Sequence, residues 1–595
     1  MKHYLNRQLP GLKPTGSLLK RIIGIVLSFC FALPLFAQDI LLRGTVSDAE
    51  HKDPIIGANV VVKGTTIGAA TDMNGHFELN VPLNSTLVIS YIGYVDKEVT
   101  VRNNSPLAIL LEDDAFLLGE VVAIGYGSQK KKELTGSVAG LKEGELIKGV
   151  QTNPMGMLQG KVAGLNISKP NGGDPNSDYK FQLRGASSLT GNTSPLIIID
   201  GIPQGDLSAI PQDDIESIDI LKDGSAAAIY GTRGTNGVIL VTTKRGSAGK
   251  TTVSYSGYAS IATIANQLDL MNREQFLANG GIDRGYDTDW MKEITRTPFI
   301  HSHNLSLTGG TNEFNYRASL SYKDNPGLAI NSGYNELIAR FVANQSLLNN
   351  RIQIAYDATY RRFNQENVKD SEDDYNAYSA FKHAQHYNPT APVYDPENTS
   401  SGGYYALAIQ NYDNPVAYMK QRIKETKGGL FQGSARITWN IIEGLRAQVF
   451  GSVNYMDKNL GQYQSREIYN TSNYGYAKRR YDNRRNETIE TTVDYVKGFG
   501  KHNLVVLGGY SYEHNFKEHF QMYNTNFDSD VFSCYNMGAG TNLLNDPKQD
   551  MMESDISQDN LVSFFGRVNY NYDERYLLSA SIRHEASTRL GANHK

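Results

Sequence analysis

The chain has few cysteines, little net charge and low overall hydropathy, and each shortage excludes a class of protein. It contains 2 cysteines among 595 residues, too few for a disulfide framework. The net charge of −4 gives no indication of a nucleic-acid partner. The mean hydropathy of −0.41 excludes a bundle of membrane helices. It does not exclude membrane-crossing strands, which need apolar residues at only every second position.

Aromatic residues and glycine are plentiful, and the N-terminus has the features of an export signal. The 36 Tyr, 21 Phe and 56 Gly fit a β-rich envelope protein. Lys20 and Arg21 precede the apolar run Ile22–Phe36, and Ala37 offers a small residue for cleavage. We therefore predict a signal peptide at residues 1–37. Its removal takes Cys30 with it and leaves Cys534 alone, so no intrachain disulfide is expected.

Residues 38–112 contain short β-prone runs separated by turn residues, as in a small β-sandwich. Motifs G-x-V, P-x-x-G-A, G-T and T-D-x-x-G-x-F follow in this order from Gly44 to Phe77. In this order they resemble the carboxypeptidase-regulatory-like domain, a non-catalytic accessory sandwich. The stretch lacks an H-x-x-E zinc pair, so no peptidase activity is assigned. Asp72–Gly75 lacks the remaining ligands of a calcium loop, and we expect a tight turn there.

The linker at residues 113–130 carries a second motif, Glu120, Val121, Val122, Ala123 and Ile124. This β-prone stretch could add to the exposed sheet edge of a partner through main-chain hydrogen bonds. It could also be an ordinary edge strand. It is similar to the segment that serves as the TonB box in transporters of the SusC type. Its position after the sandwich favours that interpretation.

Residues 131–246 carry, in this order, Leu183-Arg184-Gly185, Ile199-Asp200-Gly201, Leu221-Lys222-Asp223 and Ile229-Tyr230-Gly231. These motifs resemble the plug domain of TonB-dependent receptors in the SusC/RagA family, and an α+β fold is implied. Gly231, Gly234 and Gly237 permit turns before the last strand of this region. Their G-x-x-G-x-x-G spacing and the helix-then-strand order are not those of a nucleotide-binding loop. Residues of the matching motifs are Arg184, Gly185, Asp200, Gly201, Lys222, Asp223, Tyr230, Gly231 and Gly237.

Long strands with a two-residue alternation follow in residues 247–595. Leu320 and Tyr322 alternate with Ser319 and Ser321, for example, which gives one lipid-compatible face and one polar face. We count eleven candidate strands, joined alternately by short turns and by long stretches near 264–300, 364–427, 459–482 and 521–557. Transporters of this size class close with roughly 22 strands. The expected fold is mainly β: a small sandwich, a plug, and an incomplete antiparallel transmembrane β-barrel, the N-terminal half of a truncated one.

The resemblance implies energy-coupled import of a glycan oligomer or peptide across the outer membrane. It also implies three partners: a TonB-type energy-transducing protein, a SusD-like surface lipoprotein and the outer-membrane lipid. No cofactor, metal or catalytic residue is expected. The acidic run of Asp370, Glu372, Asp373 and Asp374 could suggest a surface hydrolase, but a solvated loop is the better interpretation.

Three questions stay open at the level of the sequence. A passive receptor or adhesin is the main alternative to a transporter, and a non-functional truncated transporter is another. The substrate-binding residues are unknown. Loop aromatics could stack on sugar rings, but we expect them to pack the loops: Trp290, Tyr375, Tyr378, Tyr404 and Tyr405.

Overall fold

The computed structural model describes residues 39–591 except for short stretches. The stretches left out are 50–51, 56, 66, 73, 92–93, 95, 112–120, 124–127, 131–136, 152, 171–172, 184, 186–192, 223–227, 368–378, 396, 398–400, 408–412, 469–473 and 546–550. The predicted signal peptide therefore lies outside the described residues. The chain divides into two compact units, Met1–Glu120 and Val121–Lys595, and each is described by itself.

The first unit is the expected small β-sandwich. One sheet has the strand order β4-β1-β7 and the other β3-β2-β5-β6. Alternate residues such as Leu42, Val60 and Leu87 are fully buried between them. The sequence did not reveal β3, because Gly-Ala-Ala lacks the β-branched residues typical of strands. The strands are β1 (Asp39–Asp48), β2 (Asn59–Val62), β3 (Gly68–Ala70), β4 (His76–Pro82), β5 (Thr86–Ser90), β6 (Lys97–Thr100) and β7 (Leu107–Leu111).

A tight turn precedes β4, as the sequence predicts. The Asp72 carboxylate accepts hydrogen bonds from the backbone N–H groups of His76, at 2.9 Å, and Asn74, at 2.8 Å. These two bonds lower the pKa of Asp72. Gly75 has a φ of +74°, which favours glycine. The aspartate therefore organises the turn through its backbone contacts.

The second unit begins with the plug, which we define as described residues 137–243. Its main sheet has the order β10-β15-β16-β13-β14, and β11 and β12 form a separate hairpin. Three isoleucines of β15 are fully buried in the core: Ile215, Ile218 and Ile220. This confirms the buried side that the sequence predicts and shows that the segment is a strand. The strands are β10 (Val138–Lys142), β11 (Leu165–Ser168), β12 (Lys180–Leu183), β13 (Leu196–Ile199), β14 (Ile202–Pro203), β15 (Ile215–Leu221) and β16 (Val238–Thr243).

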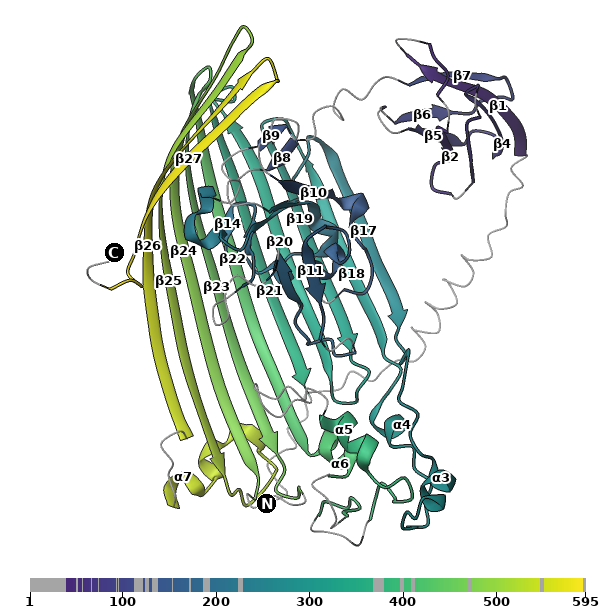
Figure 1. Cartoon of the computed structure of the whole chain (residues 1–595), viewed down its shortest axis with the longest axis vertical. Coiled ribbons are helices and arrows are strands. Elements are labelled where there is room, and N and C mark those ends of the chain that lie inside the picture. The colour runs from purple at the N-terminus through teal and green to yellow at the C-terminus, as the bar shows by residue number, and fades with distance from the viewer. Residues whose placement is uncertain are drawn as a thin grey trace, which may run out of the picture. The chain divides into compact units, whose positions relative to one another are not determined.

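Eleven antiparallel strands, the number expected, form one large sheet in which each strand pairs with its neighbours in sequence. The plug lies against one face of this sheet (Figure 1). Ser319 and Ser321 are buried on that face, whereas Leu320 and Tyr322 are exposed on the other, which confirms the predicted alternation. The strands are β17 (Gly249–Ile261), β18 (Phe299–Gly310), β19 (Phe314–Pro326), β20 (Gly333–Leu347), β21 (Ile352–Asn367), β22 (Arg422–Ile442), β23 (Leu445–Gln464), β24 (Tyr476–Phe499), β25 (His502–Thr525), β26 (Met552–Tyr572) and β27 (Tyr576–Ser587).

Several strands reach further into the predicted long stretches than the sequence indicates. Residues 476–482 and 521–525 were expected in loops, but they belong to β24 and β25, each 24 residues long. The reason lies in the outer face of these extensions. On β24 that face carries Arg479 and the other face carries Lys478 and Arg480, so both faces are polar and the alternation that signals a strand is lost.

The long connections pack against one another at the end of the sheet opposite the tight turns (Figure 1). Trp290 is buried there, its ring lies edge-on to Tyr387 at 4.9 Å, and its Nε1–H donates to the Asn388 carbonyl. Tyr404 and Tyr405 pack against the same cluster. No helix in the described part of the chain is long and apolar enough to cross a bilayer. The helices are α3 (Arg273–Ala278), α4 (Trp290–Ile294), α5 (Ser379–His386), α6 (Pro415–Lys420) and α7 (Asn542–Asn545).

Candidate functional site

The candidate site is the interface between the plug and the large sheet, and Asp200 lies at its first contact. Asp200 follows β13, and Gly201, with a φ of +94°, turns the chain into β14. The Asp200 carboxylate accepts hydrogen bonds from the N–H and hydroxyl of Thr243, at 3.1 and 2.6 Å. It also pairs with Arg340 of β20 and with Arg245, each at 3.0 Å.

Burial and charge act in opposite directions on Asp200. Its side chain is 2% exposed, as is that of Arg340. Burial alone raises the pKa of Asp200, but the guanidinium groups of Arg245 and Arg340 outweigh it and lower that pKa below its ordinary value. Arg340 also pairs with Asp357 of β21. One arginine of the sheet thus joins a plug carboxylate to a carboxylate of the next strand.

Asp214 makes a second buried contact with the sheet. Its carboxylate is completely buried and lies 2.6 Å from the guanidinium of Arg317 on β19. Ser319, two residues further along β19, donates its hydroxyl to the same carboxylate. Asp214 was not among the predicted site residues. The sequence nevertheless contains an indication that Asp214 forms an ion pair. An acidic residue among apolar residues is costly to bury unless it is paired.

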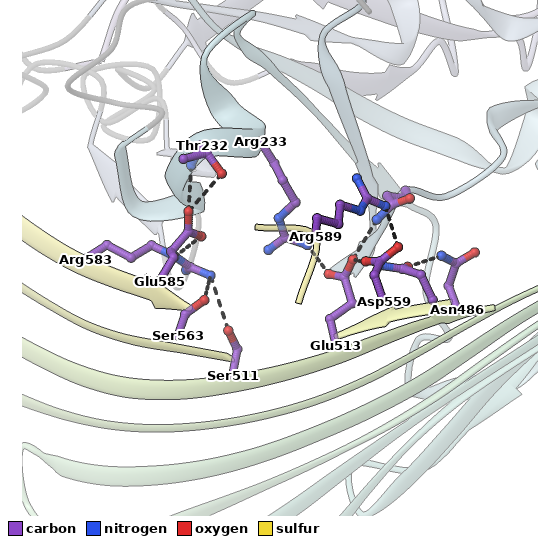
Figure 2. Close-up of polar contacts among 12 residues, drawn as sticks. Thr232, Arg233, Asn486, Ser511, Glu513, Asp559, Ser563, Arg583, Glu585 and Arg589 are labelled. Carbon is purple, nitrogen blue, oxygen red and sulfur yellow. Dashed lines mark hydrogen bonds and ion pairs between the residues drawn. The ribbon is translucent and has the colours of Figure 1, made fainter. Parts of the chain in front are cut away.

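The segment Ala228–Gly234 contacts the last strands of the sheet, as Figure 2 shows. Tyr230 is buried with Leu507 and Phe565, and this burial raises the pKa of its phenol. Thr232 donates from its N–H and its hydroxyl to one oxygen of Glu585, at 3.0 and 2.9 Å.

Two further contacts join the same segment to the sheet. Arg233 forms an ion pair with Glu513. Arg583 donates to the Ile229 carbonyl at 2.7 Å and to Glu585 at 2.8 Å. The acceptors on the sheet are therefore held in place by neighbouring side chains.

Two glycines of this region cannot be replaced without a local change. Gly231 has a φ of +66°, and a Cβ there would collide with the Glu585 carboxylate. Gly237 has a φ of +89°, and a Cβ there would collide with the Leu183 side chain. Glycine is therefore favoured at both positions for two reasons: the turn that the sequence predicts and the close packing of neighbouring side chains.

A cavity of about 720 Å³ borders this second group of contacts. Gln204, Thr232 and Arg233 line it from the plug, and Glu513 and Asp559 line it from the sheet. Gln204 donates to Glu513 at 2.6 Å across its margin. Among the described residues no group of three His, Cys, Asp or Glu side chains could hold a metal ion.

The structure brings four of the predicted site residues to this interface, namely Asp200, Gly201, Tyr230 and Gly231. Gly185 has a φ of +100° with open space around it, and Lys222 donates its backbone N–H to the Ser137 carbonyl. The backbone of Val121, Val122 and Ala123 forms strand β8 (Val121–Ala123), which pairs with β9 (Ser128–Lys130). The remaining predicted site residues lie outside the described residues: Glu120, Ile124, Arg184 and Asp223.

Sequence reasoning missed the residues that pair with the plug. Arg317, Asp357 and Arg583 could be placed on the polar faces of their strands, but their partners could not be named. Thr232 and Glu585 are 353 positions apart. Contacts over such separations depend on how the plug sits against the sheet, which no local pattern encodes.

Comparison with known proteins places these features in context. Residues 42–123 match the CarboxypepD_reg-like domain family, and residues 130–238 match the TonB-dependent Receptor Plug Domain family. The chain is 31% identical to the TonB-dependent receptor SusC of Bacteroides thetaiotaomicron, over 98% of this chain and 60% of that protein. It is 32% identical to the TonB-dependent receptor P26 of Formosa agariphila, over 95% and 58% of the two chains.

A solved structure has the same fold. The RagAB peptide importer in its open-open state matches with a TM-score of 0.67 and 22% identity, over 80% of this chain and 57% of that one. The chain therefore spans somewhat more than half the length of the relatives that it matches.

Proposed function

Because the chain belongs to the SusC/RagA family of TonB-dependent outer-membrane receptors, we propose that it acts in the active import of a nutrient across that membrane. The observation that carries the proposal is the interface itself. The plug lies against the polar face of the sheet, and polar contacts hold one side of it at the margin of a cavity. Contacts of this kind can be exchanged for water when the plug is displaced.

The proposal assigns a role to each part of the chain. Residues 38–112 are an accessory sandwich, residues 113–130 hold the TonB box, residues 131–246 are the plug, and residues 247–595 contribute to the barrel. Glu120–Ile124 would pair with a TonB-type protein by strand addition. We assign no catalytic step to any residue.

The partner and the substrate follow by analogy. One solved relative is named a peptide importer and contains the second protein of the RagAB pair. We propose that a SusD-like surface lipoprotein works with this chain, and that the substrate is a glycan oligomer or a peptide.

Deleting Glu120–Ile124 tests the transport proposal against a passive receptor. We expect uptake by cells to be lost while substrate binding at the surface is retained, because the deletion removes only the segment that receives the pulling force. Deletion of the equally long stretch Asp113–Leu117 in the same linker is the control. If uptake survives the first deletion unchanged, the protein is not a TonB-driven importer.

A further inference from the structure

Two cations lie side by side on the plug-facing side of the large sheet, in a row of residues beyond the plug. The register places Arg484 of β24 directly opposite Lys517 of β25. Thr488 and Glu490 of β24 and Glu513 of β25 are buried on the side that contacts the plug. The pairing of β24 with β25 has no register shift. Arg484 and Lys517 therefore point to the same side as those residues.

Two of the acids near this pair in the register already have partners. Asp482, two residues from Arg484, is bound by Arg480 at 2.8 Å and by His519 at 2.9 Å. Asp559 on β26 accepts from Arg589 at 2.7 Å and from Asn515 at 2.8 Å, and it also interacts electrostatically with Lys517. Within the described part of the chain, the ion pairs include neither Arg484 nor Lys517, and both residues are exposed.

A third cation, Lys458 of β23, lies on the same side. The register places it opposite Asp482, whose oxygens already bind Arg480 and His519. Like charges directly opposite on neighbouring strands destabilise a sheet. The facing pair of Arg484 and Lys517 is therefore unfavourable for the protein alone and becomes favourable when an anion lies between the two cations.

The position of this cluster connects it to the cavity beside the plug. Asn515 and Asp559 line that cavity of about 720 Å³. Lys517 lies two residues beyond Asn515 towards the long loops, a step of about 7 Å along the strand. A molecule that comes from the loops along this part of the sheet passes the three cations before it reaches the cavity.

We propose that Arg484 and Lys517, assisted by Lys458, bind a carboxylate or sulfate group of a ligand at the loop-side rim of this cavity. A guanidinium can bind either group through two parallel hydrogen bonds, and an ammonium adds a point charge. The ligand class is therefore acidic: an oligomer that carries carboxylates or sulfate esters. The binding of this ligand does not depend on the proposed function. Only the statement that the ligand is an imported substrate rests on it.

Thermal unfolding of the full purified chain in detergent tests the site. Sodium sulfate represents a sulfate ester, sodium acetate represents a carboxylate, and sodium chloride at equal ionic strength is the reference. The test variant is Arg484→Gln with Lys517→Gln. The control is Arg485→Gln with Lys497→Gln, which removes the same charge from the opposite side of β24. Sulfate also stabilises proteins in general, and that effect is common to all three proteins.

We expect sulfate or acetate to raise the melting temperature of the natural chain and of the control more than that of the test variant. The test variant should need about tenfold more anion for the same shift, because it has lost two charged donors. The anion for which the natural chain and the test variant differ more identifies the group that is bound. If all three proteins respond equally to both anions, the proposal is wrong. The assay needs no TonB-type partner, so its result is independent of the uptake test.

Discussion

The two sides of the plug are attached to the sheet in different ways. On the β19–β21 side, Asp200 and Asp214 form ion pairs with Arg340 and Arg317, and three of these four side chains are no more than 2% exposed. On the β25–β27 side, Thr232 and Arg233 contact Glu585 and Glu513 beside a large cavity. Arg233 is 18% exposed there, although its partner Glu513 is 4% exposed.

This difference predicts which side of the plug would separate from the sheet first. Breaking a buried ion pair leaves an unpaired charge in a medium of low dielectric constant. Groups beside a cavity can be rehydrated, so their separation costs less. We therefore expect the plug to be held more firmly at β19–β21 than at β25–β27, and the following substitutions test that contrast.

The largest effect is expected for Arg340→Met. This change leaves Asp200 without its partner on the sheet and Asp357 without its nearest cation. We expect the plug to lose about 3–5 kcal/mol of stability, as is typical when one member of a buried pair is removed. Proteolysis of the plug at increasing urea concentration measures this loss. Arg233→Met is the matched change on the other side, and an equal loss there would remove the contrast.

Gly231→Ala is expected to have the next largest effect. At a φ of +66° and a ψ of −149°, an alanine is strained by about 1–3 kcal/mol. The new Cβ would also displace the Glu585 carboxylate from Thr232. Gly160→Ala separates the two causes, since Gly160 has a φ of +73° and open space around it. If both variants lose equal stability in the urea assay, the contact with Glu585 contributes nothing.

The sequence predicted the elements of both sides, but not the contrast between them. The alternation in β19 and the buried isoleucines of β15 follow from local periodicity, which is why the strands and the core were predictable. Asp214 and Arg317 are 103 positions apart, so their pairing depends on tertiary packing. The long strands β24 and β25 were underestimated because their ends are polar on both faces.

Glu585→Gln is expected to weaken the β25–β27 side without breaking it. Thr232 can still donate to the amide oxygen, but Arg583, which donates to the other oxygen of Glu585, loses its charged acceptor. We expect a loss of about 2 kcal/mol, in the range of a hydrogen bond to a charged group. Hydrogen exchange of the backbone amides in residues 228–237 measures it. Exchange should accelerate there and stay unchanged in β15, and a uniform acceleration over the plug would contradict a separately released side.

The smallest effect is expected for an ion pair on the surface of the plug. Its loss of stability is the reference for the losses on the two sides of the plug. Glu143 lies 2.8 Å from Lys148 and 2.8 Å from Lys244, and its side chain is 35% exposed. Burial is the largest single influence and raises the pKa of Glu143, but the two lysines together outweigh it, so the net shift is downward. We expect Glu143→Gln to cost about 0.5 kcal/mol at pH 7, since partly exposed ion pairs contribute little.

The pH dependence of this loss identifies its cause. A lowered pKa stabilises the folded state fully above the ordinary glutamate value of about 4.3, and this contribution disappears as the pH falls through the lowered value. The natural chain and the Glu143→Gln variant should therefore differ at pH 7 and converge in the urea assay as the pH falls through the lowered pKa of Glu143. Glu216→Gln, at an exposed position of β15 with no ion pair among the described residues, is the control. A difference that stays constant as the pH falls would mean that packing, and not charge, holds Glu143 in place.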